Sequence, residues 1–304
     1  MKVYEIKIRP LTGFGIPIQG DTLFGHLCWQ FYYDSKLLGK TLDYFLEIYT
    51  RKPFIIVSSA FPVVDGNVYL VRPALPIHYL TKLSEDEIVE KRKELKKLNY
   101  FKLSLPLSSL CEISYKRLEY IKEEEQVRCS IHRLLGTTAK APFGPYAVKK
   151  IWYLTDLVIF IGIRENISIE GVLEALKRIG KFGYGRDASL GWGKFDVLEI
   201  KERDFYKNVK SFNAYYTLGP SLPESNEYEK IYFEPFVKFG KHGDKLSISK
   251  NPFKAPVLMA NTGAIYIPKK PDRRTYLGKA IFGVSSVLET AVTQAYSLVI
   301  PVEV

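Results

Sequence analysis

The segment 182–195, FGYGRDASLGWGKF, is the part of the sequence best suited to binding chemistry. Gly183, Gly185 and Ala188 fit the G-x-G-x-x-G/A spacing with which Rossmann folds hold a dinucleotide phosphate. That chemistry requires a strand before the loop and a helix after it, so that the helix N-terminus points at the phosphate. Here a helical pattern precedes the loop and a strand-like run follows it. Because this order is reversed, the spacing does not indicate a dinucleotide site.

The same loop suits a sugar-phosphate backbone. Glycine lets the chain approach a ligand closely, and successive backbone N–H groups form a nest for anions. Arg186 and Lys194 add the positive charge that phosphate contacts use. Aromatic residues beside glycine, such as Phe14 and Trp192, suit stacking with unpaired bases, with core packing as the alternative. The residues of this loop therefore predict a site that binds the phosphates of RNA.

Groups that could catalyse a reaction are few. The four histidines are scattered, and the three cysteines lack C-x-x-C spacing, so neither set forms a metal site. His26 could act as a general base on a ribose 2′-hydroxyl, or it could simply pack within its helix. No G-x-S-x-G turn and no defined pair of carboxylates occurs. We therefore expect a binding protein that is not an enzyme and needs no cofactor and no metal.

The charge of the chain favours a polyanionic partner. The 304 residues carry a formal net charge of +11, with a pI near 9.3. The stretches 238–254 and 269–279 each hold five basic residues against one acidic residue. A solvated surface, or adaptation to high temperature, is the alternative reading of such charge. Aromatic residues make up 14% of the chain and are often interleaved with basic residues, as in Tyr100, Phe101 and Lys102.

The elements that must position the loop follow from hydrophobic periodicity. We expect strands near 3–10, 54–60, 152–163 and 194–200, and helices over 22–33, 84–98 and 168–181. Ser84 with Glu87 resembles a capping box, and Ser168 is a candidate N-cap. The order strand–helix–strand, twice, predicts an α+β, ferredoxin-like (RRM-like) domain over 1–203. Residues 84–131 are expected to be an insertion of charged helix and hairpins that projects from it.

The remainder of the chain, 204–304, is expected to form a second, degenerate ferredoxin-like domain. Short strands are predicted over 212–218, 230–239, 257–267 and 295–304, with one helix-like stretch near 276–292. No apolar run approaches the length of a membrane span, and the N-terminus MKVYEIKIRP alternates instead of forming the apolar region of a signal peptide. We therefore expect a cytoplasmic protein that does not bind membranes.

Four stretches together resemble the RAMP superfamily of CRISPR proteins, and within it the subunits that hold the 5′ handle of crRNA in type III-A (Csm) effectors. They are GDTLFGHLCWQ (20–30), KELKKLNYFKLSL (93–105), CSIHRLLGTTAKAPF (129–143) and GYGRDASLGWGKF (183–195). AYYTLGPSLP (214–223) and TQAYSLVIPV (293–302) extend the resemblance into the C-terminal part.

The resemblance implies two tandem ferredoxin-like domains and a non-catalytic subunit that binds the crRNA 5′ handle. It also implies a thumb-like hairpin that kinks the RNA, docking of the large palm-domain subunit, and contact with a backbone RAMP subunit. The alternative within the superfamily is a metal-independent endoribonuclease that uses His26. The expected RNA-binding residues are Phe14, Gly15, Gly20, Asp21, Thr22, Arg133, Gly183, Gly185, Arg186, Ser189, Gly191, Trp192, Gly193 and Lys194.

Overall fold

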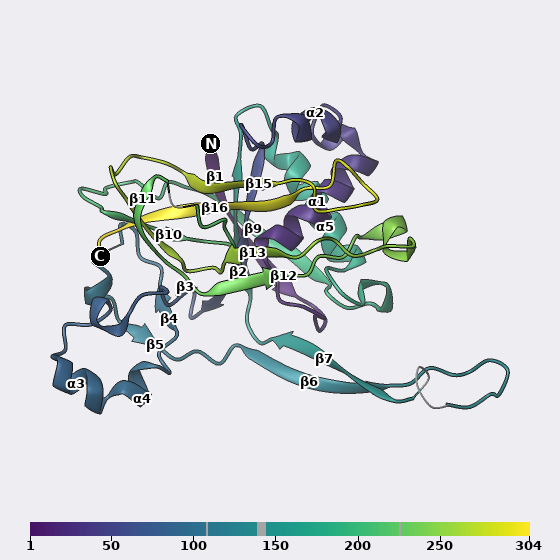
Figure 1. Ribbon diagram of the computed structural model, residues 1–304, viewed down its shortest axis with the longest axis horizontal. Helices are drawn as coiled ribbons and strands as arrows, with labels where there is room; N and C mark the ends of the chain where they lie inside the picture. The colour runs from purple at the N-terminus through teal and green to yellow at the C-terminus, as the bar shows by residue number, and fades with distance from the viewer. Residues whose placement is uncertain (108, 139–143, 225) are drawn as a thin grey trace.

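The computed structural model describes residues 1–107, 109–138, 144–224 and 226–304. Its largest sheet has seven strands in the order β5-β4-β3-β2-β8-β1-β9 (Figure 1). The strands are β1 (Lys2–Pro10), β2 (Ile55–Val64), β3 (Asn67–Val71), β4 (Tyr100–Lys102), β5 (Tyr115–Lys116), β8 (Leu157–Ile163) and β9 (Phe195–Arg203). The helices associated with it are α1 (Gly20–Tyr33), α2 (Leu42–Glu47) and α5 (Ile169–Phe182).

The four strands β2-β8-β1-β9 have the order expected for a β-α-β-β-α-β unit, with α1 and α5 as the two crossovers. All seven residues of β8 are buried, because it lies between β1 and β2 in the middle of the sheet. The Ser168 side chain accepts a hydrogen bond from the Gly171 N–H and caps α5, as predicted. The predicted α+β class and the helix before the glycine-rich loop are therefore confirmed.

The C-terminal sheet repeats this strand order without the helices. Its order is β11-β14-β10-β16-β15, and its first four strands correspond in chain order and antiparallel pairing to β2-β8-β1-β9. In the described part of 204–304 no α-helix stands at either crossover. The strands are β10 (Ala214–Thr217), β11 (Tyr228–Tyr232), β14 (Ile265–Pro268), β15 (Tyr276–Ile281) and β16 (Thr293–Val302). A separate ribbon pairs β12 (Pro235–Lys238) with β13 (Val257–Ala260).

The helix predicted near 276–292 is wrong. Its first six residues form β15, which pairs along its length with β16. Leu277, Ile281, Val284 and Leu288 have helical spacing in the sequence, but Gly278 and Gly283 adopt positive φ angles of 86° and 71°. Backbone pairing with a long central strand overrode a short periodic pattern.

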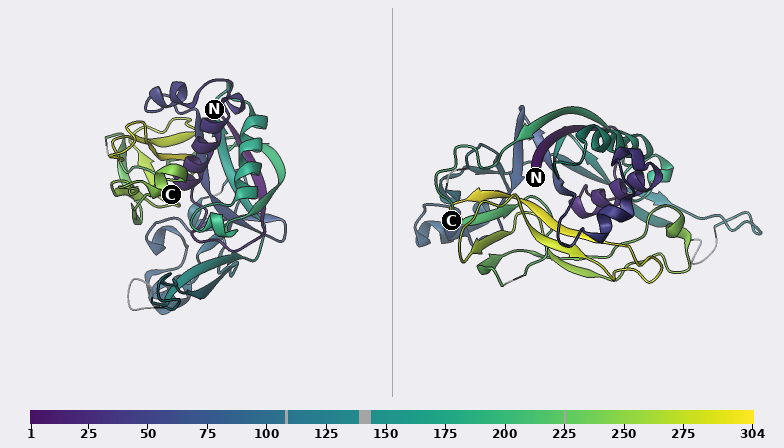
Figure 2. Two further views of the ribbon diagram at one scale, coloured as in Figure 1. Left: turned by 90° about the vertical axis from the view of Figure 1, so that its right-hand side faces the viewer. Right: turned by 90° about the horizontal axis from the view of Figure 1, so that it is seen from above.

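The two sheets share one continuous buried core. The α1 helix packs against β2, β16 and α5, so the C-terminal strands lie alongside it (Figure 2). The buried Gln294 side chain accepts a hydrogen bond from the Val57 N–H at 2.9 Å and donates to the Val57 carbonyl at 2.8 Å. Strands from 2–203 and from 214–302 form separate sheets, and the division into two domains stays a prediction.

The insertion differs from its prediction. The β4 and β5 strands extend the main sheet, and Phe101 and Leu110 lie in its core, so this part does not project. The projecting hairpin consists of β6 (Ile121–Arg128) and β7 (Tyr146–Tyr153) (Figure 1). The predicted strand 152–163 is therefore two strands, and the predicted helix 84–98 is two short ones, α3 (Glu85–Glu90) and α4 (Arg92–Leu95). The predicted capping box at Ser84 is present.

Candidate nucleic-acid interface

The glycine-rich loop folds tightly between α5 and β9. Gly183, Gly185, Gly191 and Gly193 all have positive φ angles. A Cβ atom on Gly193 would lie 2.2 Å from the Tyr184 carbonyl oxygen, and one on Gly183 would lie 2.3 Å from the Trp192 carbonyl oxygen. Nothing lies within 4 Å of such an atom on Gly191. At Gly183 and Gly193 the close approach predicted for a phosphate is thus made by the protein's own backbone.

Most backbone N–H groups of this loop donate to protein acceptors. Tyr184 and Gly193 donate to the Gly193 and Gly13 carbonyls, and the Gly185 N–H donates to His26 Nε2 at 3.0 Å. A Cβ on Gly185 would also meet Ile16 at 2.6 Å. The backbone nest expected from the sequence is therefore largely occupied by internal hydrogen bonds. A phosphate-binding role of this loop would therefore depend mainly on its side chains.

Trp192 does not offer a free stacking face. Its ring is buried, with the Arg128 guanidinium 4.5 Å and the Lys150 ammonium 4.9 Å from its centroid. Arg128 also pairs with Asp187 at 3.0 Å. The prediction of base stacking on Trp192 is corrected accordingly, because cations from the hairpin cover the ring. The same contacts fix the hairpin along the loop.

Cationic side chains gather where the hairpin passes the loop. The Arg186 guanidinium donates to the Lys149 carbonyl at 2.7 Å and keeps nearly half of its side chain exposed. Lys149 is exposed and Lys150 lies over Trp152 at 4.3 Å. Lys194 takes part in none of the ion pairs of the described residues. We name Arg128, Lys149, Lys150, Arg186 and Lys194 the loop–hairpin cluster.

Sequence reasoning missed the hairpin members of this cluster. Arg128 directly precedes the 129–143 stretch that carries the resemblance, and Lys149 and Lys150 follow it by a few residues. One signal in the sequence could have indicated this hairpin, namely the acidic run 123–125. In the antiparallel register, residues of this run lie opposite Lys149 and Lys150. The loop contacts depend on tertiary packing and leave no local pattern.

The turn before α1 lies beneath the loop and is mostly buried. Phe14 is fully buried, with its ring 5.1 Å from Tyr153 at 73°, so the predicted stacking of bases on Phe14 is corrected. A Cβ on Gly15 would lie 2.6 Å from the Arg186 carbonyl oxygen, and one on Gly20 would lie 2.1 Å from the Val57 carbonyl oxygen. These two glycines permit backbone packing rather than contact with a ligand.

Asp21 and Thr22 are bound by the C-terminal ribbon. Lys238 pairs with the buried Asp21 carboxylate at 2.8 Å and donates to the Thr22 hydroxyl. Ser189 lies exposed on the loop. Arg133 is exposed in the turn closed by His132 and Thr137, beyond the paired part of the hairpin. The end of the 129–143 stretch, 139–143, lies outside the described residues.

His26 is placed as a support for the loop. Burial lowers the pKa of His26 to about 4, so its ring is neutral at pH 7 and the Nε2 lone pair accepts the Gly185 N–H. A general base needs that lone pair for the substrate proton. In the described part of the chain no group of three His, Cys, Asp or Glu side chains could hold a metal ion. Among the same residues, no helix is long and apolar enough to cross a membrane.

We expect the His26 environment to make stability depend on pH. The pKa in the folded state lies below the unfolded value of about 6.5, so the stabilising effect is complete above pH 6.5 and is lost as the pH falls toward 4. Between pH 7 and pH 5 the free energy of unfolding should fall by about 2 kcal/mol through this group. Urea denaturation of wild type and His26→Gln at both pH values measures the difference. An equal loss in both proteins would contradict the assignment.

Comparison with solved structures was made over the whole chain. One similar chain belongs to a Csm1-Csm4 cassette in complex with pppApA, with a TM-score of 0.63 and 15% identity over 100% of this chain and 99% of that chain. Another belongs to a Csm3-Csm4 subcomplex of the type III-A CRISPR-Cas interference complex, with a TM-score of 0.62 and 14% identity over 100% of both chains. This chain has the fold of Csm4. The resemblance stated from the sequence is thereby confirmed at the level of the fold.

No protein-family profile and no curated protein matches this sequence. The likeness to these two structures nevertheless covers 100% of this chain. At this level of identity the likeness establishes the architecture, and the chemistry has to be argued from the residues of this chain.

Proposed function

We propose that this protein is a non-catalytic, RNA-binding subunit of a cytoplasmic type III-A CRISPR effector and holds the 5′ handle of crRNA. The observation that carries the proposal is the loop–hairpin cluster, in which side chains from three distant segments converge on one edge of the Csm4 fold. Phosphate contacts of Arg and Lys position a nucleic acid without reading its bases, which suits an RNA end held by a scaffold.

The partner subunits that we propose are based on the same similarity of fold. The similar chains occur in complexes with Csm1 and with Csm3, and we propose corresponding contacts here with a large palm-domain subunit and a backbone RAMP subunit. Phe182 and Leu190 are 71% and 63% exposed beside the loop, as expected for apolar side chains that a neighbouring subunit covers. We also propose that the C-terminal sheet is a second, degenerate ferredoxin-like domain, because its strand order repeats that of the first.

The endoribonuclease alternative has less support. It requires His26 as a base, yet the Nε2 atom of His26 already accepts a hydrogen bond and its pKa lies near 4. A base with so low a pKa abstracts a hydroxyl proton poorly at neutral pH. A positioning role for His26 therefore agrees better with its contacts.

We expect Arg186→Ala combined with Lys194→Ala to weaken the binding of handle RNA and to flatten its salt dependence. Each phosphate contact to a single strand contributes roughly 0.7 to the slope of log K against log salt, so two lost contacts should reduce the slope by about 1.4. Fluorescence anisotropy with a labelled handle RNA at four salt concentrations measures both quantities.

The matched control removes two exposed lysines in and just after α4, as Lys93→Ala with Lys96→Ala. It changes the net charge equally but leaves the loop–hairpin cluster intact. A folded Arg186/Lys194 variant with the slope and affinity of wild type would refute RNA binding by this cluster.

A further inference from the structure

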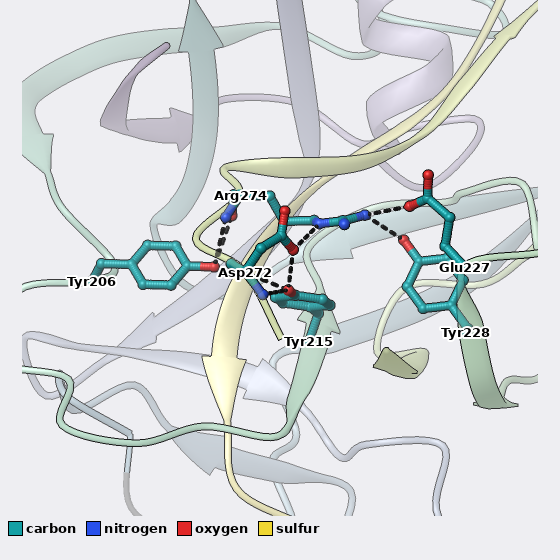
Figure 3. A network of polar contacts seen from close by, with 6 residues as sticks. All are labelled: Tyr206, Tyr215, Glu227, Tyr228, Asp272 and Arg274. Atoms are coloured by element: carbon teal, nitrogen blue, oxygen red, sulfur yellow. Dashed lines mark hydrogen bonds and ion pairs between the residues drawn. The ribbon is translucent and has the colours of Figure 1, made fainter. Parts of the chain in front are cut away.

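The two basic stretches found in the sequence have different environments. In 269–279, other groups of the protein neutralise or bind several of the basic side chains. Arg274 donates to Asp272 at 2.7 Å and to Glu227 at 2.8 Å, within a network that includes three tyrosines (Figure 3). Lys269 donates to the Asn226 carbonyl, and Lys279 pairs with Glu224. This network holds the loop before β15 against the C-terminal sheet. The charge of these three residues therefore has a structural explanation.

The stretch 238–254 is different. Within this stretch, Lys238 forms an ion pair with Asp21. Lys241, Lys245 and Lys250 are exposed, and none of them takes part in an ion pair of the described residues. Asp244 is the one acidic residue of the stretch. The segment therefore presents positive charge that the protein does not neutralise.

Exposed phenylalanine rings accompany these lysines. Lys241 lies opposite Phe253 in an isolated bridge, and its ammonium is 5.9 Å from the centre of that ring. Phe239 precedes Lys241 by two residues, in the segment that joins β12 to this bridge. Phe239 is 76% and Phe253 64% exposed. Large rings left in solvent beside lysines are unusual unless a partner covers them.

The opposite face of this ribbon is anchored to α1. Lys238 reaches Asp21 and Thr22, and Lys254 lies beside Asp21 and Cys28. Farther along, a Cβ on Gly243 would lie 3.0 Å from the indole nitrogen of Trp29. The phenylalanine face is thus directed away from the helix on a supported backbone. In Figure 1 the segment is the green loop that leads out from β12 and back into β13, above the projecting hairpin.

We propose that Phe239, Lys241, Lys245, Lys250 and Phe253 form a second contact for single-stranded RNA, separate from the loop–hairpin cluster. Proteins that hold unpaired strands without sequence preference combine a basic surface with rings on which bases stack. Unneutralised lysines favour a polyanion, and the exposed rings favour one with unpaired bases. The inference goes beyond the proposed handle site and does not require it.

Binding of a labelled 15-nucleotide oligouridylate, which lacks any handle sequence, tests this surface. Lys241→Gln, Lys245→Gln and Lys250→Gln in one variant should flatten the log–log salt slope by about 2.1, at roughly 0.7 for each phosphate contact. Phe239→Leu with Phe253→Leu should instead weaken binding about tenfold or more at an unchanged slope, because stacking is lost while charge is kept. Circular dichroism confirms that each variant is folded.

The control variant is Lys93→Gln, Lys96→Gln and Lys97→Gln, which removes the same charge from exposed positions in and just after α4. Wild-type affinity and slope in the Lys241/Lys245/Lys250 variant would overturn the proposal, as would equal flattening in the α4 control. Normal RNA binding together with loss of an acidic partner subunit would also overturn it and assign the patch to protein docking. Because the Arg186/Lys194 variant and the Lys241/Lys245/Lys250 variant alter different surfaces, failure of either site is recognised independently.

Discussion

Gly193→Ala should destabilise the protein by about 4 kcal/mol or more, whereas Gly191→Ala should cost only about 1–2 kcal/mol. Both glycines have similar left-handed φ angles, 74° and 84°. They differ in the space around them, since a Cβ on Gly193 would lie 2.2 Å from the Tyr184 carbonyl oxygen and 2.5 Å from its nitrogen. Backbone atoms cannot move aside without opening the loop. Gly191 has nothing within 4 Å.

Urea denaturation of the two variants measures the difference, and the pair controls for backbone strain. Both alanine substitutions carry the cost of a positive φ angle. The difference between the free energies of unfolding of the two variants therefore reports the steric contact alone. Equal stabilities would show that the loop is looser than the contacts of Gly193 indicate. The result also bears on function, because an open loop would displace Arg186 from the loop–hairpin cluster and Trp192 from the cations that cover its ring.

Lys238→Met should cost about 3 kcal/mol of stability, near the lower end of the range for breaking a buried ion pair. The Asp21 side chain is 2% exposed and that of Lys238 is 20% exposed. Loss of the ammonium leaves the Asp21 carboxylate without its 2.8 Å partner in a buried site. The penalty comes from the uncompensated charge rather than from the lost attraction.

The double variant Asp21→Asn with Lys238→Met separates these two contributions. Removing both charges should recover most of the stability that Lys238→Met loses, because residue 21 then no longer carries the buried negative charge that lost its partner. Thermal unfolding of the single and double variants forms a complete cycle. If the double variant is as unstable as the sum of the single variants, Lys238 acts through its packing on α1 and not through Asp21.

Local patterns predicted the elements that frame the loop. Ser168 begins α5 and Gly183 ends it, and the strand that follows was expected within a few residues of β9. These signals are local, because a cap and an amphipathic face lie within one helix. The apolar run that forms β8 was likewise visible, although its first residues belong to β7 across a break at 154–156.

The site could be predicted only in part. Glycine positions mark where the chain turns, but the sequence does not show whether a ligand or the protein fills the space beside them. Trp192 and Phe14 illustrate the same limit, since burial of a ring depends on partners such as Arg128 and Tyr153 that are distant in sequence. Arg186 remains nearly half exposed, because a charged side chain on a tight loop has few ways to become buried.

The amide of Gln294 has a consequence for how the molecule unfolds. By binding both the N–H and the carbonyl of Val57, it completes the hydrogen bonding of a β2 residue next to the irregularity in that strand. A buried peptide group in the N-terminal half thus depends on a side chain from β16 in the C-terminal sheet. The two halves should consequently melt in a single cooperative transition. During synthesis, the Val57 peptide group would lack these two hydrogen bonds until β16 has emerged from the ribosome.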